Sequence, residues 1–276
     1  MNKSSALESF KFEGVEVSGI DNLLEVGQLN EKQEDERRFV IFAPNHIEPN
    51  SKVRKILAFA EDFPRLESVL SVQGLETSLL FRGDGDMEIG DSFLKGFLYN
   101  THRKIFSALG RAYIGGIPLA INAKEPGKAI AKNIPAMREV MTTLKKKNLT
   151  IYPYGNWFPA GEQKFEELAA ATTIAARRVA PGEDGFVSKD NFEDWRKSLK
   201  SGFIRIAKRT GAPIVPVYVD NTDGKWSMNF GELIYVGKND DIVKVGEAYL
   251  KEMRKLREMS ENRRLHPYQK VLSDGT

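Results

Sequence analysis

The sequence predicts an α/β protein, in which a mixed, mostly parallel sheet is flanked by helices in a single domain. Two observations carry this prediction. Short runs of apolar, largely β-branched residues alternate along the chain with amphipathic helical patterns, and the runs are apolar at nearly every position, as strands covered on both faces are. No repeat of fixed period and no linker rich in glycine, serine or proline divides the chain, so we expect one domain over residues 1–276.

The first half of the chain is expected to alternate strands and helices after an N-terminal extension, residues 1–37, in which no element is predicted. Continuous apolar runs predict strands at Arg38–Pro44, Leu66–Gln73, Ala112–Ile114 and Pro118–Ile121. Apolar residues that recur every three or four positions predict helices at Asn50–Ala60, Ser92–Leu109 and Lys128–Lys147, the last one bent at Pro135.

The second half continues the alternation. Strands are predicted at Leu149–Pro153, Pro213–Val219 and Gly231–Gly237, and helices at Glu162–Arg178, Trp195–Arg209 and Asp240–Ser260. The composition of Ala180–Asn191 predicts a loop. Gly211 is well placed to end the helix predicted at Trp195–Arg209. The C-terminal helix and tail, residues 240–276, are basic and carry an apolar stripe, Leu250, Met253, Leu256 and Met259, which either faces a membrane surface or docks on the core.

The composition excludes several classes of function. The chain has no cysteine, which removes thiol nucleophiles and thiolate metal sites, and its three histidines disfavour a three-histidine metal centre, so no metal is expected. The net charge of +3 is too small to indicate a nucleic-acid partner. Because we find neither a signal peptide nor an apolar run long enough to span a bilayer, we expect a cytoplasmic protein, with peripheral attachment to the inner face of the membrane as the alternative.

The segment Phe42–Val53 holds the first candidate site residues. An apolar strand ends there and places Asn45 and His46 at the following turn, where open α/β sheets bind their ligands. His46 is either a general base, since its ordinary pKa allows both protonation states near neutrality, or a structural residue that caps a loop. Asn50 and Ser51 are good N-cap residues for the next helix and are explained equally well by that role.

The segment Thr150–Glu162 is the second candidate. A strand again runs into a turn, which proline and glycine residues force into a tight shape. Tyr154, Asn156 and Trp157 crowd this turn with aromatic and amide groups, a composition typical of the walls of binding sites. The turn is therefore either a binding wall or a packed turn with exposed aromatic side chains.

These segments, in their order along the chain, resemble the lysophospholipid acyltransferase superfamily, the glycerol-phosphate and acylglycerol-phosphate acyltransferases. The resemblance covers Arg38 to Gly237. It rests on four segments: Asn45-His46, Gly116 to Asn122, Pro153-Tyr154-Gly155-Asn156, and a Ser-Gly helix followed by Ala-Pro-Ile-Val-Pro-Val at 212–217.

The chain departs from the family pattern at the reactive positions. Family members have His-x-x-x-x-Asp, in which the aspartate orients the imidazole, but the aspartate position here is Ser51. The family's two phosphate-binding arginines are replaced by Asn122 and Trp157. Asn50, Ser51 or Glu48 is then expected to orient His46. The loss of two bidentate cations favours a neutral polar or apolar acceptor over a phosphate dianion.

The resemblance implies an O-acyltransferase of lipid metabolism. It would move a fatty acyl group from an acyl thioester of acyl-carrier protein or coenzyme A to a lipid or other hydroxyl acceptor, with no further cofactor. The expected site residues are catalytic His46 and Ser51, and substrate-binding Asn45, Asn50, Gly116, Asn122, Tyr154, Gly155, Asn156 and Trp157. His46, Ser51, Asn122 and Tyr154–Trp157 are expected to line one cleft. The alternative is a catalytically decayed acyltransferase fold that binds lipid or protein. Lys145–Lys147 is either a docking patch for the acidic carrier protein or a solvated helix end.

Overall fold

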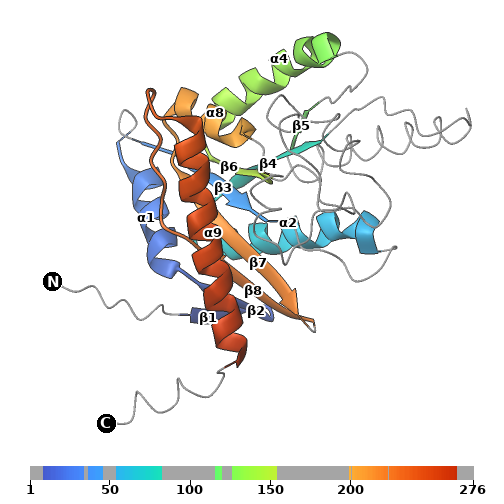
Figure 1. Ribbon diagram of the computed structural model, residues 1–276, viewed down its shortest axis with the longest axis vertical. Helices are drawn as coiled ribbons and strands as arrows, with labels where there is room; N and C mark the ends of the chain where they lie inside the picture. Colours follow the sequence, from blue (N-terminus) through green and yellow to red (C-terminus); the bar gives the residue numbers. More distant parts are fainter. Residues whose placement is uncertain are drawn as a thin grey trace, which may run out of the picture.

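The computed structural model (Figure 1) describes residues 9–33, 37–45, 54–82, 116–119, 126–153, 199, 201–222 and 224–265. The strands in these residues are β1 Ser9–Phe12, β2 Val15–Ser18, β3 Ile41–Pro44, β4 Thr77–Arg82, β5 Ile117–Leu119, β6 Asn148–Ile151, β7 Ile214–Thr222 and β8 Lys225–Phe230. The helices are α1 Ile20–Glu31, α2 Arg54–Val72, α4 Pro126–Thr143, α8 Gly202–Thr210 and α9 Ile242–Leu265.

The described strands form one eight-stranded sheet in the order β1-β2-β8-β7-β3-β6-β4-β5. Five consecutive strands, from β7 to β5, are mutually parallel. β8 runs antiparallel to β7, β2 runs parallel to β8, and β1 runs antiparallel to β2. The sheet is therefore mixed and mostly parallel, with helices on its faces, and the predicted α/β fold class is confirmed.

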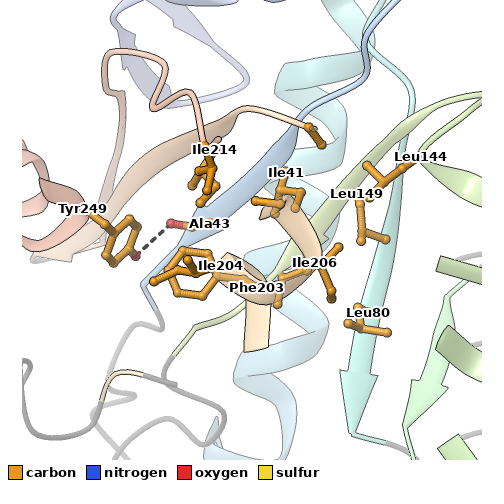
Figure 2. Packing of buried hydrophobic residues seen from close by; sticks show 14 of the residues in the cluster. Ile41, Ala43, Leu80, Leu144, Leu149, Phe203, Ile204, Ile206, Ile214 and Tyr249 are labelled. Carbon is orange, nitrogen blue, oxygen red and sulfur yellow. Dashed lines mark hydrogen bonds between the residues drawn. The ribbon is translucent and has the colours of Figure 1, made fainter. Parts of the chain in front are cut away.

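Helices cover both faces of the sheet. Phe42 of β3, and Val40 directly before it, pack with α1 and α2 on one face, whereas Ile41 and Ala43 pack with α4, α8 and α9 on the other. All four of these side chains are fully buried. Burial on both faces explains why β3 is apolar at every position, because neither side of the strand meets water. Figure 2 shows the second face, where Phe203 of α8 stands edge-on to Tyr249 of α9.

The predicted strand at Leu66–Gln73 is wrong, because these residues belong mostly to α2. Leu66, Val69 and Leu70 are fully buried while Ser71 and Val72 are exposed, a spacing of three and four residues that only a helix satisfies. The helix continues through Pro64. The strand that the sequence analysis missed is β4, which begins after the turn at Gly74.

The predicted strand at Gly231–Gly237 is also wrong. Only Ile234 pairs there, through an isolated bridge to Ile214. The strand next to β7 is instead β8, which is joined to it by a tight turn with Gly224 at φ +77°. The N-terminal extension also has structure that was not predicted, since it supplies β1, β2 and α1.

The other described elements lie close to their predicted positions. The strands predicted at Arg38–Pro44, Pro118–Ile121, Leu149–Pro153 and Pro213–Val219 correspond to β3, β5, β6 and β7, and the helices at Lys128–Lys147, Trp195–Arg209 and Asp240–Ser260 to α4, α8 and α9. Gly211 ends α8 in a left-handed conformation, as expected. The elements predicted at Ser92–Leu109, Ala112–Ile114, Glu162–Arg178 and Ala180–Asn191 lie outside the described residues.

The apolar stripe of the C-terminal helix docks on the core. Leu250, Met253 and Leu256 are buried against the β3–β7 side of the sheet, and Met259 packs beside them. The stripe is therefore not available to a membrane surface. No helix in the described part of the chain is long and apolar enough to cross a bilayer.

Tyr249 fastens α9 to the centre of the sheet, because its buried hydroxyl donates a 3.0 Å hydrogen bond to the Ala43 carbonyl of β3 (Figure 2). We expect Tyr249→Phe to lower the free energy of unfolding by about 1 kcal/mol, the net value of one buried hydrogen bond. Urea unfolding measures this loss. Tyr235→Phe is the matched control, since its hydroxyl bonds Glu25 at the surface and its removal should change stability by less than about 0.5 kcal/mol. Equal stability of the two variants would contradict a structural role for the Tyr249 hydroxyl.

Candidate functional site

The two segments singled out in the sequence leave the sheet side by side. β3 and β6 are neighbours and run parallel, with Phe42 opposite Thr150. Counting onward in this register, Asn45 and Pro153 occupy the same row at the carboxyl ends of the two strands. The next residues along the chain are His46 and Tyr154. The chain therefore departs toward both predicted site segments from one edge of the sheet.

Prolines open the sheet at this edge. The β3–β6 ladder would next need an N–H of residue 44 for the Ile151 carbonyl, but Pro44 has none. Pro153 also lacks the donor that a longer ladder would use. The pairing of β3 with β6 therefore ends at Phe42 and Thr150.

This edge is also a topological switch point. The connection from β3 runs through α2, on one face, to β4; the connection from β6 runs through α8, on the opposite face, to β7. The two connections also move in opposite directions along the sheet. Open α/β sheets bind ligands in the crevice outside the carboxyl ends of two such strands. The β3–β6 edge is therefore the candidate site that the topology selects.

Asn45 is the predicted site residue that the structure describes best. Its side chain is 7% exposed and reaches β7: Nδ2 donates to the Val219 carbonyl at 2.9 Å, and Oδ1 accepts from the Val219 N–H at 2.7 Å. Its own N–H donates to the Val217 carbonyl at 3.2 Å. The amide of Asn45 is thus engaged with the main chain of the sheet.

Gly116 is not brought to this edge. It is buried at the start of β5, and the pairs Leu80–Ile117 and Leu80–Ile151 place it one row before Ile151. Asn45 lies two rows beyond Ile151 and so three rows beyond Gly116, and β3 is three strands away from β5. At strand spacings of 3.3 Å per residue and 4.8 Å between strands, the two residues are about 17 Å apart. Gly116 therefore lies directly before the amino end of β5, whereas Asn45 follows the carboxyl end of β3.

Arg82 is a residue at this edge that the sequence analysis missed. It ends β4, and the register between β4 and β6 places its backbone in the row of Pro153. It adds a cationic residue to the carboxyl edge of the sheet. The signal in the sequence was an arginine directly after the apolar run Ser-Leu-Leu-Phe, but β4 itself was not predicted.

The other predicted site residues lie outside the described residues: His46, Glu48, Asn50, Ser51, Asn122, Tyr154, Gly155, Asn156 and Trp157. Tyr152, near the start of the second segment, is buried against Phe63 of α2 and Leu79 of β4. The end of β6 is therefore held in the core up to the point where the candidate site begins.

Lys145–Lys147 lies at the edge of the sheet opposite to the candidate site, where the parallel strands begin. These lysines follow α4 and directly precede β6, so they stand at the amino edge of the parallel strands. Lys145 and Lys146 are exposed. The position matches a solvated helix end and does not place the run beside the ends of β3 and β6.

The described titratable groups with resolved pKa shifts belong to the framework of the fold. Burial raises the pKa of Glu67, an effect that the positive charge of Lys147 opposes, and burial together with a hydrogen bond to Glu25 raises the pKa of Tyr235. A hydrogen bond to Glu232 raises the pKa of Lys255. Among the described residues, no group of three or more histidine, aspartate or glutamate side chains is arranged to hold a metal ion.

Comparison with known proteins finds no family model that matches the chain and no curated protein with a significant match. What the described residues define is an α/β protein with a topological switch point between β3 and β6.

Proposed function

We propose that the chain is an acyltransferase that moves a fatty acyl group from an acyl thioester of coenzyme A or acyl-carrier protein to a hydroxyl acceptor, with His46 as the general base. One observation carries the proposal beyond the sequence motifs. Asn45 and Pro153 lie in the same row, directly after the adjacent strands β3 and β6, at a switch point of the sheet. The chain therefore enters the histidine segment and the aromatic segment from adjacent strands.

The proposed reaction follows from the groups assigned to this edge. The neutral imidazole of His46 takes the proton of the acceptor hydroxyl as its oxygen attacks the thioester carbonyl. The new C–O bond forms, the C–S bond breaks, and the proton passes from the imidazolium to the departing thiolate. Asn50 or Ser51 orients the imidazole in place of the family aspartate. Because the phosphate-binding arginines are absent at 122 and 157, the acceptor is a neutral alcohol or lipid.

Release of free thiol from acyl thioesters tests this proposal. The purified protein is incubated with acyl-CoA and acyl-carrier-protein thioesters of several chain lengths, together with mixed lipid and alcohol acceptors. We expect thiol release that depends on the acceptor and an ester product identified by mass spectrometry. Thiol release without an ester product would indicate a thioesterase instead and would contradict acyl transfer.

The second candidate function is a lipid-binding module with a decayed active site, which the substitutions at 51, 122 and 157 favour. This candidate predicts lipid that copurifies with the protein, no turnover of any thioester, and a lipid affinity that His46→Ala leaves unchanged. The thiol-release assay and a lipid-binding titration, each carried out on the parent protein and on His46→Ala, distinguish the acyltransferase from the lipid-binding module.

A further inference from the structure

The side chain of Asn45 continues the hydrogen-bond ladder of the sheet after the main chain of β3 has ended. In the parallel β3–β7 pair, the Ile41 and Asn45 N–H groups donate to the Pro213 and Val217 carbonyls. The next donor on β7 is the Val219 N–H, which in an unbroken ladder would meet the main-chain carbonyl of residue 45. It donates instead to Asn45 Oδ1, at 2.7 Å.

The same amide also supplies the next donor of the ladder. In an unbroken strand the Val219 carbonyl would accept from the main-chain N–H of residue 47. In its place it accepts from Asn45 Nδ2, at 2.9 Å. Both groups of Val219, a residue that is 2% exposed, are thus satisfied by the side chain of residue 45. The buried N–H and carbonyl of Val219 therefore have hydrogen-bond partners without any contribution from the main chain beyond residue 45.

This arrangement sets where the chain leaves β3. If the main chain of residues 46 and 47 had to pair with Val219, it would stay in the plane of the sheet. The side-chain amide of Asn45 removes that requirement. Together with the main-chain N–H of Asn45, it anchors this residue at three points on β7, namely the Val217 carbonyl and both main-chain groups of Val219. The residue directly after this anchor is His46.

We infer that Asn45 is a positioning residue rather than a substrate-binding one: its amide fixes the exit of the chain from β3 and thereby the backbone from which His46 acts. The inference rests on the proposed function for the role of His46. The hydrogen-bond arrangement of Asn45 itself is independent of that role.

Asn148 provides a matched control at the opposite edge of the same sheet. It is fully buried at the start of β6, its Oδ1 accepts from the Val40 N–H at 2.9 Å, and its Nδ2 donates to the Glu76 carbonyl at 3.0 Å. Asn45 and Asn148 are therefore both buried asparagines whose amides bond the main chains of neighbouring segments. They differ in position: Asn148 lies at the amino ends of the parallel strands, away from the candidate site, whereas Asn45 lies at their carboxyl ends.

The test compares Asn45→Ala with Asn148→Ala at a temperature where circular dichroism shows both variants to be folded. In the thiol-release assay we expect Asn45→Ala to lower kcat by about 10-fold to 100-fold, with KM for the thioester within about threefold of the parent value. Asn148→Ala should keep kcat within about twofold. Equal losses in the two variants would overturn the inference, because they would show only a general effect of a weakened sheet.

A second measurement needs no turnover. The imidazole pKa of His46 is read by NMR, with its resonance assigned by its absence in His46→Gln. We expect Asn45→Ala to move this pKa by about half a pH unit or more and Asn148→Ala to leave it in place. An unchanged His46 pKa in folded Asn45→Ala would overturn the positioning role. If the pKa moves but the parent protein transfers no acyl group, the proposed function fails while the coupling of Asn45 to His46 stands.

Discussion

Replacement of His46 by alanine is expected to lower kcat for acyl transfer by about 10² to 10⁴, the usual contribution of a positioned general base. Without the imidazole, the acceptor hydroxyl must lose its proton to water, and the attacking oxygen is a weaker nucleophile. Thiol release from the acyl thioester, measured with saturating acceptor, checks the prediction. KM for the thioester should change little, because the base acts on the acceptor and not on the donor.

The pH dependence of the same reaction gives a second reading of His46. Only the neutral imidazole accepts a proton, so kcat/KM of the parent enzyme should rise with pH through the His46 pKa, ordinarily about 6.5, and level off above it. His46→Gln should remove this acidic limb together with the activity. His266→Gln is the control, since it removes an imidazole from the C-terminal tail and should leave both intact. Parent-level activity in His46→Ala would exclude His46 from the mechanism.

Replacement of Gly19 by alanine is expected to lower the free energy of unfolding by about 2 to 5 kcal/mol. Gly19 lies between β2 and α1 at φ +79°, where a non-glycine residue costs about 1 to 2 kcal/mol. A Cβ there would also lie 2.0 Å from the carbonyl oxygen of Phe230, at the end of β8. This contact involves backbone atoms of a central strand, so relief requires the sheet to shift, and such overpacking adds about 1 to 3 kcal/mol.

A variant at Gly14 separates the conformational cost of a positive φ from the cost of the close contact with Phe230. Gly14 has φ +79° as well, in the turn between β1 and β2, but an added Cβ there would meet no atom within 4 Å. Gly14→Ala should therefore lose only the conformational part, about 1 to 2 kcal/mol. Chemical unfolding of the two variants measures the difference. If Gly19→Ala is no less stable than Gly14→Ala, the close approach of Gly19 to Phe230 does not limit the packing of β2 and α1.

The sequence was most informative where a strand is buried on both faces. β3, β6 and residues 214–219 of β7 are buried at every position, and all three strands were predicted within a few residues. β8 was missed because the strands were predicted from continuous apolar runs, whereas Lys225–Phe230 alternates polar and apolar residues, the pattern of a half-buried strand. The run Leu66–Gln73 was misassigned because a short apolar run fits a strand and a buried helix face equally well.

The candidate site was predictable only in its parts. The end of β3 at Asn45 and the end of β6 at Pro153 could be recognised from apolar runs that stop at proline-containing turns. The bonding of the Asn45 amide to Val219 could not, because it joins residues 174 positions apart. The position of Gly116 in the sheet could not be predicted for a similar reason, since it depends on the register of β5 against β4.

The amino-acid sequence by itself determined that the chain forms an α/β sheet, which segments supply its most buried strands, and at which turns the chemically interesting residues follow. Only the tertiary structure decided that β3 and β6 are neighbours, that their connecting helices cover opposite faces, and that α9 buries its apolar stripe. The physical reason is that apolar periodicity records how deeply a residue is buried, whereas strand order and register depend on pairings between backbones far apart in the chain.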